Sequence, residues 1–128
     1  MTQSSRGEVV ILIVEDEQLI RMDAADMIRD LGFKVLEAAN ADQAIALLET
    51  NLDIAAVFSD VQMPGSMDGL ALIAAIRDRW PPVALFLTSG QVHPPVSAMP
   101  AGTRFVSKPY APHQLRAEFD ALLGSPRN

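Results

Sequence analysis

A run of six consecutive apolar residues, 9–14, constrains the fold of this 128-residue chain more than any other feature. Most of these residues are β-branched, and a run without a polar position predicts a strand that is buried on both faces, as in a parallel sheet. Short segments of similar strand character follow at 33–38, 54–58, 83–87 and 104–107. The sequence therefore predicts five strands of one parallel sheet.

Apolar residues at helical spacing separate these strands. In the segment that follows the first strand, Leu19 and Ile20 belong to the apolar stripe, and Gly32 stands where the helix would end. Asn40 and Gln43 have the spacing of a capping box and so predict the start of the next helix. The predicted helices span residues 17–31, 40–48, 69–79 and 112–123.

The connection between the fourth and fifth strands departs from this pattern. Pro94, Pro95 and Pro100 fall in it, and proline removes a backbone donor and clashes inside helices. We therefore expect the fourth helix to be short, irregular or missing. The chain as a whole predicts a single α/β domain, in which a doubly wound parallel sheet carries helices on both faces.

Composition excludes several classes of protein. The net charge of −6 argues against a broad nucleic-acid surface, because phosphate contacts need lysine and arginine. Without cysteine the chain forms neither disulfides nor thiolate metal sites. Residues 1–8 lack the apolar core of a signal peptide, and no apolar run reaches the length of a membrane span. We expect a cytoplasmic protein without a nucleic-acid or membrane partner.

Ionisable and hydroxyl side chains follow the predicted strands at the point where each strand ends. Glu15 and Asp16 follow the first strand, Asp60 the third, Thr88 the fourth and Lys108 the fifth. The carboxyl ends of parallel strands meet at one edge of a sheet, where open α/β folds have their sites. Clustered carboxylates repel one another unless a cation offsets them, and a ligand set made only of oxygen suits Mg²⁺.

Such a group of side chains suits phosphoryl transfer. A carboxylate near Mg²⁺ and a lysine is well placed to attack phosphorus, because the two cations neutralise the charge that spreads over the phosphoryl oxygens. Aspartate nucleophiles that form an aspartyl phosphate are a recognised class of covalent chemistry. The strand-end residues thus predict a metal-assisted phosphoryl acceptor.

The order of these residues along the chain resembles that found in the receiver domain of bacterial two-component response regulators, and the resemblance covers about residues 8–124. The resemblance implies a flavodoxin-like sheet with strand order 2-1-3-4-5, with a flexible tail at 1–7 and a C-terminal tail at 125–128. Each matching piece is short, and the specificity lies in their order, each at a strand end. The pieces are Val14-Glu15-Asp16-Glu17, Ser59-Asp60-Val61-Gln62-Met63-Pro64, Asp68-Gly69, Leu87-Thr88-Ser89-Gly90 and Lys108-Pro109.

The resemblance implies a role for each acidic residue. Asp60 is the expected phosphoacceptor, Asp16 the direct Mg²⁺ ligand and Glu15 a ligand through water. Asp60 itself and the backbone carbonyl of Gln62 would complete the protein's share of the coordination. Mg²⁺ is thus the cofactor that the resemblance implies.

Further residues belong to the implied switch. Thr88 would move to bond the phosphoryl group, and Lys108 would pair with it. Phe105 matches the family's rotating aromatic residue, although a phenylalanine in a parallel strand is as often plain core. The peptide bond between Lys108 and Pro109 would be cis, a form that only X-Pro bonds adopt readily.

The implied function is a signalling switch. A histidine kinase or a histidine phosphotransfer protein would present phospho-His, and Asp60 would take the phosphoryl group. Output would follow by contact with a downstream protein, or the domain would serve as a phosphate sink in a phosphorelay. It would catalyse only its own phosphorylation and dephosphorylation, and so would not be an enzyme for other substrates.

Some features depart from the family pattern. Gly65-Ser66-Met67 lengthens the loop before Asp68 by one residue, the fourth helix is rich in proline, and Phe105 has no hydroxyl for a partner to read. The chain also ends at Asn128, soon after the last predicted helix. We therefore expect a stand-alone receiver, or one cut from a larger protein.

Other interpretations compete with this one. A plain structural interpretation makes Asp60 a strand-end cap, Asp68 a helix cap and the helix arginines, such as Arg21, solvated surface residues. A phosphohydrolase or phosphotransferase with an aspartyl nucleophile would place that aspartate after the first strand, with a second aspartate two residues on, an arrangement that Glu15-Asp16-Glu17 does not give. A flavodoxin-like cofactor binder would need a phosphate loop rich in serine, threonine and glycine there, where this chain has acids. A degenerate receiver, which binds partners without phosphorylation, conflicts with the complete set of strand-end residues.

Overall fold

The computed structural model describes residues 9–91 and 93–124. The expected tails, 1–7 and 125–128, lie outside these residues. Within the described part of the chain, no helix combines the length and the apolarity that a membrane crossing requires. The elements are β1 (Val10–Val14), α1 (Gln18–Asp30), β2 (Lys34–Ala38), α2 (Ala41–Thr50), β3 (Ile54–Asp60), α3 (Gly69–Arg79), β4 (Ala84–Ser89), the 3₁₀ turn η2 (Val96–Ala98), β5 (Arg104–Ser107) and α4 (Pro112–Leu123).

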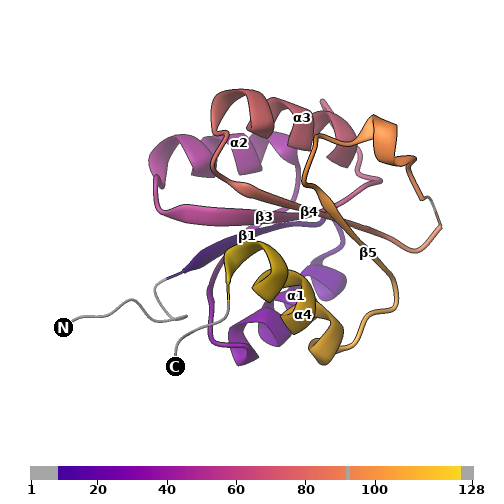
Figure 1. Ribbon diagram of the computed structural model, residues 1–128. Coiled ribbons are helices and arrows are strands. Elements are labelled where there is room, and N and C mark those ends of the chain that lie inside the picture. Colours follow the sequence, from indigo (N-terminus) through magenta and orange to yellow (C-terminus); the bar gives the residue numbers. More distant parts are fainter. Residues whose placement is uncertain (1–8, 92, 125–128) are drawn as a thin grey trace.

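The strands form one parallel sheet in the order β2-β1-β3-β4-β5, which confirms the doubly wound, flavodoxin-like prediction. Figure 1 shows α2 and α3 on one face of the sheet and α1 and α4 on the other. Because helices cover both faces, every residue of β1 is buried. Successive side chains of β1 alternate between two cores rather than between core and solvent, which explains its continuous apolar run.

Each face of the sheet has its own apolar core. One core packs α2 and α3 against residues that include Leu12 and Val57, and the other packs α1 and α4 against the opposite face. In the second core, Phe119 of α4 packs edge-on against Phe58 and Phe86, with ring centroids 6.0 and 4.7 Å away. Close packing on both faces fixes the strands, and with them the side chains at the strand ends.

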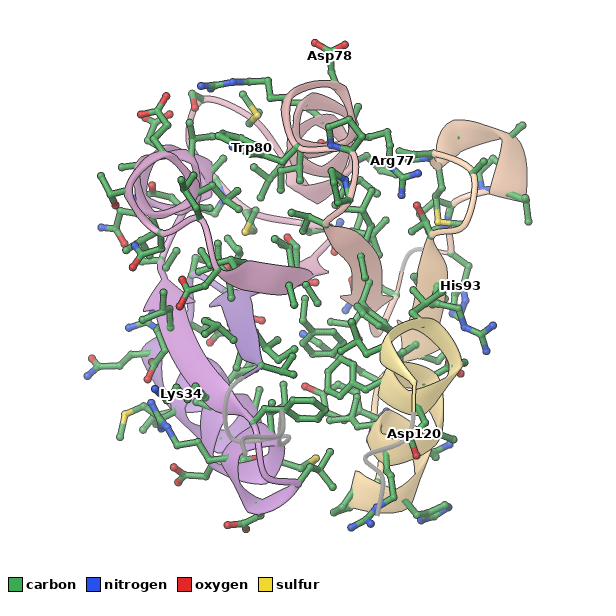
Figure 2. The ribbon with its side chains drawn as sticks, turned by 60° about the vertical axis from the view of Figure 1, so that its left-hand side comes forward. Lys34, Arg77, Asp78, Trp80, His93 and Asp120 are labelled. Atoms are coloured by element: carbon green, nitrogen blue, oxygen red, sulfur yellow. The ribbon has the colours of Figure 1, made fainter. Side chains whose placement is uncertain are left out.

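Between β4 and β5 the described residues form only the turn η2, so the expected short or irregular fourth helix is confirmed. Pro95 precedes this turn in an extended conformation. Figure 2 shows Arg77 reaching from α3 toward this segment, and its Nη1 donates to the carbonyl of Ala101 at 3.0 Å. A side chain of α3 therefore holds the segment between β4 and β5, which lacks a packed helix.

The helix ends follow the sequence signals. Gly32, directly after the C-cap of α1, has a φ of 103°, the left-handed conformation that glycine adopts without steric cost. The side chain of Asn40 accepts from the backbone N–H of Gln43 at 2.9 Å, and that of Asp68 accepts from the backbone N–H of Ala71 at 2.9 Å. Asp68 is thus a helix cap, as predicted.

The buried face of α1 differs from the predicted stripe. Leu19 is 79% exposed and Ile20 is 37% exposed, so placing both on the inward face was wrong. The face that packs on the sheet contains Ala24 and Ile28. A step of three residues toward the helix start leads from Ala24 to Arg21, and a step of four leads to Ile20. Arg21 is the less exposed of the two, so a charged residue takes part in the inward face of the first turns.

Candidate functional site: an acidic cluster at the sheet edge

The end of β1 contributes a buried glutamate. Glu15 has 5% of its surface exposed. Its backbone N–H donates to the carbonyl of Ala38 at 3.0 Å, and its Oε2 accepts from the backbone N–H of Glu17 at 3.0 Å. Its Oε1 lies 3.3 Å from Nζ of Lys108. One carboxylate oxygen therefore supports the start of α1, while the other faces the end of β5.

Asp60, the last residue of β3, lies beside Glu15. Its side chain is 13% exposed, and Oδ2 lies 3.5 Å from Nζ of Lys108. Glu15, Asp16 and Asp60 each offer a carboxylate oxygen, and these oxygens lie within 4.8 Å of one another. Lys108 is 93 positions from Glu15 along the chain, so the sheet topology alone brings the ends of β1, β3 and β5 together.

The electrostatics of this cluster favour a bound cation. Burial raises the pKa of Glu15 above its usual value, and the like charge of Asp60 adds to this effect. The N–H of Glu17 and the ammonium of Lys108 oppose it. Three carboxylates against one ammonium leave an excess of negative charge. A donor set made only of oxygen suits a hard divalent cation, so this cluster could hold a metal ion.

Thr88 stands next to Asp60 in the sheet, since the two residues are partners in the register of β3 and β4. Its side chain is buried. Its hydroxyl donates to the carbonyl of Val106 in β5 at 2.6 Å. The structure therefore brings the hydroxyl to the same edge as the acidic cluster, where it is bonded to the neighbouring strand.

Comparison with known proteins identifies this arrangement. The family model for the response regulator receiver domain matches residues 11–120. The chain belongs to this family. An NtrX-like response regulator of Rickettsia bellii is 36% identical over 104 residues, which cover 78% of this chain and 22% of that protein. The sensor kinase CckA of Brucella abortus is 32% identical over 123 residues, which cover 91% of this chain and 13% of that protein. The receiver thus spans less than a quarter of either relative.

Solved structures agree with this assignment. The receiver domain of the hybrid histidine kinase CckA has a TM-score of 0.76 at 33% identity, with 89% of this chain and 98% of that chain covered. A response regulator receiver domain from Clostridium thermocellum has a TM-score of 0.83 at 22% identity, covering 90% and 94% of the two chains. The first likeness supports the family, and the second shows the fold. As a member of this family, the chain is a phosphoryl-accepting signalling domain.

Two further residues that the resemblance singles out, Phe105 and Pro109, lie in β5 and just after its end. Phe105 is half-buried and packs against the core on the α2 and α3 face. Its ring centroid lies 5.1 Å from that of His93, which is exposed. The peptide bond between Lys108 and Pro109 is cis, the isomer that the resemblance implies. Rotation of Phe105 remains a prediction.

The lengthened loop of the receiver, residues 63–67, is tied to α2. The hydroxyl of Ser66 donates to Oδ1 of Asp42 at 2.7 Å. Gly65 has a φ of 110°, which glycine adopts at little steric cost. Gln62 is exposed at the start of this loop, and the role of its carbonyl as a metal ligand remains a prediction.

Sequence reasoning did not foresee the role of Gly69, the first residue of α3. Its N–H donates to the carbonyl of Val61 at 2.8 Å. A Cβ atom at this position would overlap the carbonyl oxygen of Asp60 and lie 2.9 Å from the carbonyl carbon. Glycine therefore allows α3 to begin directly against the backbone of Asp60. The Asp-Gly pair was visible in the sequence, but this contact was not.

Two further residues near the cluster were also missed. Arg21, expected on a solvated face, is only 17% exposed, and its Nη1 donates to the backbone carbonyl of Glu15 at 2.9 Å. An arginine in phase with the apolar positions of α1 was the signal that could have found it. Burial, with the negative charge of Glu15 adding to it, raises the pKa of Tyr110 to about 12.

Proposed function

We propose that Asp60 of this receiver accepts a phosphoryl group from a phospho-His donor, with Mg²⁺ held by the acidic cluster. The observation that carries this proposal is the meeting of Glu15, Asp16 and Asp60 within 4.8 Å, with Lys108 3.5 Å from the Asp60 carboxylate. In this arrangement Asp60 is the nucleophile and Lys108 the neighbouring cation. The function is then a phosphorylation switch whose chemistry lies at the carboxyl edge of the sheet.

The phosphoryl transfer needs a free carboxylate oxygen and an electrophile that can approach it. A carboxylate oxygen of Asp60 forms a bond to phosphorus while the P–N bond of the donor breaks, and the electron pair of that bond remains on the imidazole nitrogen. Lys108 stays near the oxygens that gain negative charge, because its Nζ already lies within 3.5 Å of both Glu15 and Asp60. Hydrolysis of the aspartyl phosphate returns Asp60 to its starting state.

The ligands for Mg²⁺ would be Asp16, Asp60 and the Gln62 carbonyl, with Glu15 acting through water. When bound, the ion supplies positive charge that neutralises the phosphoryl oxygens and the clustered carboxylates. Glu15 suits an indirect role because its two carboxylate oxygens already have partners, the Glu17 N–H and the Lys108 ammonium. Asp16 suits a direct role because it is exposed at the open side of the cluster.

Phosphorylation would be read through Thr88 and Phe105. The Thr88 hydroxyl would leave the carbonyl of Val106 and donate to a phosphoryl oxygen, and Phe105 would turn inward as Thr88 moves. The sheet register supports this exchange, because Thr88 and Asp60 are partners in adjacent strands and the hydroxyl has only a short way to move. The surface that changes would be the face formed by β5, the segment carrying η2, and α4.

The proposed partners follow from this chemistry. Receiver domains of two-component systems pair with histidine kinases, so a histidine kinase or a histidine phosphotransfer protein in the cytoplasm would supply the phosphoryl group. The phosphorylated receiver would contact a downstream protein or act as a phosphate sink. In either case it would act on its own aspartate and on no external substrate, and so would not be a conventional enzyme.

Intact-mass spectrometry after incubation with acetyl phosphate tests this proposal. The wild type should gain one phosphoryl group when Mg²⁺ is present and none when it is chelated. Asp60→Asn should gain none. Asp53→Asn is the matched control, because Asp53 is exposed just before the opposite end of β3 and should leave the adduct intact. An adduct on Asp60→Asn, or no adduct on the wild type after long incubation, would refute the assignment.

A further inference from the structure

Arg21 is a mostly buried cation in the first turns of α1, with 17% of its side chain exposed. Its Nη1 donates to the backbone carbonyl of Glu15 at 2.9 Å, and its Nε pairs with Oε1 of Glu37 in β2 at 3.2 Å. Burying a charge is costly unless it gains partners, and both partners here have fixed positions. We propose that Arg21 is a positioning residue of the receiver, which orients the peptide between Glu15 and Asp16 for metal binding.

The peptide group explains how this bond acts on Asp16. A peptide is planar, so the direction of the Glu15 carbonyl also sets the direction of the following N–H and the start of Asp16. The side chain of Glu15 is held separately by the N–H of Glu17 and by Lys108. Asp16 is exposed, so its orientation depends on the peptide groups that flank it. Arg21 thus fixes the one acidic ligand that burial does not fix.

The carboxylate of Glu37 offsets part of the positive charge of Arg21. Its Oε1 pairs with Arg21 and its Oε2 lies 3.4 Å from Nη2 of Arg29, so one carboxylate bridges two arginines of α1. The two arginines therefore share a counter-ion and a helix. They differ in that Arg21 donates to Glu15, whereas the described contacts of Arg29 are with Glu37 and with Asp26.

The sign of the effect on Mg²⁺ affinity separates positioning from simple charge. A cation beside the acidic cluster repels Mg²⁺, so on charge alone the removal of Arg21 should tighten binding. Loss of positioning should weaken it instead, and residues that orient metal ligands typically contribute about 10-fold to 100-fold in affinity. We expect a weakening of about tenfold for both Arg21→Met, which loses the charge, and Arg21→Lys, which keeps the charge but loses the planar fork.

The experiment measures Mg²⁺ affinity by isothermal titration calorimetry on wild type, Arg21→Met, Arg21→Lys and Arg29→Met, with a thermal melt of each variant. Arg29→Met is the matched control, since it removes the same charge from the same counter-ion; its affinity should stay within about twofold of wild type, the scale of a screened surface charge. Intact-mass measurement of phosphoryl uptake at limiting Mg²⁺ should show the same order. If Arg21→Met fails to fold, Arg21→Lys carries the test.

This inference rests on the proposed metal-assisted function, and the experiment distinguishes the failure of one from the failure of the other. Weaker binding in both Arg21 variants and normal binding in Arg29→Met supports the positioning role. Tighter or unchanged binding in Arg21→Met, normal binding in Arg21→Lys, or equal losses in Arg21→Met and Arg29→Met would overturn it. If the wild type itself binds no Mg²⁺, the proposed function fails, and the positioning role fails with it.

Discussion

Replacing Gly69 by alanine tests how closely α3 approaches Asp60, the proposed phosphoacceptor. The added Cβ would overlap the carbonyl oxygen of Asp60, and it would lie 2.9 Å from both the carbonyl carbon of Asp60 and the Cα of Val61. Carbon atoms in favourable contact are about 3.5–4.0 Å apart, so each contact is too short by about 0.6 Å or more. All three atoms belong to the main chain of the loop and of β3. No flexible side chain can therefore absorb the displacement.

The expected cost is a loss of about 2 kcal/mol or more in the free energy of unfolding. Overpacking of a well-packed site typically costs about 1–3 kcal/mol, and contacts with the backbone lie toward the upper end because they relax least. Alanine returns at most about 1 kcal/mol through its higher helix propensity, and less at a first helical residue. With a urea m-value of about 2 kcal/mol per molar, the unfolding midpoint should fall by about 1 M.

Urea unfolding followed by the fluorescence of Trp80 measures this change. Trp80 is the only tryptophan of the chain and caps the C-terminus of α3, the helix that must move. Gly90→Ala is the matched control, because a Cβ there would meet the Cβ of Lys108 at 3.6 Å, an ordinary contact. Its midpoint should not fall. A Gly69→Ala variant as stable as Gly90→Ala would refute the close-approach argument.

Three further predictions follow from the described contacts. Tyr110, the only tyrosine, should titrate near pH 12 when its phenolate absorbance is followed. Because this folded pKa lies above the unfolded value of about 10, the contribution of Tyr110 to stability should be complete below pH 10 and disappear as the pH rises to 12. Tyr110→Phe should not show this loss of stability. Asp68→Ala should lower the unfolding free energy by about 1 kcal/mol, since it removes the cap on the Ala71 N–H; Asp68→Ser should restore most of it. Phe119→Ala should cost about 3–5 kcal/mol in the same assay, because it empties the centre of the α1 and α4 core, and a cost below 1 kcal/mol would contradict that packing.

The sheet and the acidic cluster could be predicted because they depend on short-range patterns and on topology. An unbroken apolar run such as that of β1 is compatible with few architectures, and right-handed crossovers then place helices on both faces of the sheet, whereas the strand order came from the family resemblance. Once the strands are parallel, their carboxyl ends share one edge. Glu15, Asp60 and Lys108 were therefore expected at the same edge, and in the structure Nζ of Lys108 lies 3.3 and 3.5 Å from the two carboxylates.

The helix face of α1 could not be predicted in the same way. Leu19 and Ile20 are apolar and Arg21 is charged, so hydrophobicity alone assigns the inward position incorrectly. The actual face is set by Ala24 and Ile28, which pack on the sheet and fix the rotation of the helix. The partners of Arg21, a backbone carbonyl and Glu37, exist only once β1, β2 and α1 are assembled. The same is true of Gly69, because the main-chain atoms that leave no room for a side chain there belong to Asp60 and Val61.

The proposed switch requires only a modest free-energy difference, and the contacts of Thr88 indicate its scale. In the structure the hydroxyl donates to the uncharged carbonyl of Val106 at 2.6 Å, a bond with a net value of about 0.5–1.5 kcal/mol. A bond to a charged phosphoryl oxygen is worth about 1.5–3 kcal/mol. The exchange therefore favours the phosphorylated arrangement by about 1–2 kcal/mol, which shifts a two-state ratio by about 5-fold to 30-fold. Such a shift biases an equilibrium without locking it, so unphosphorylated molecules should already sample the active arrangement at a low level.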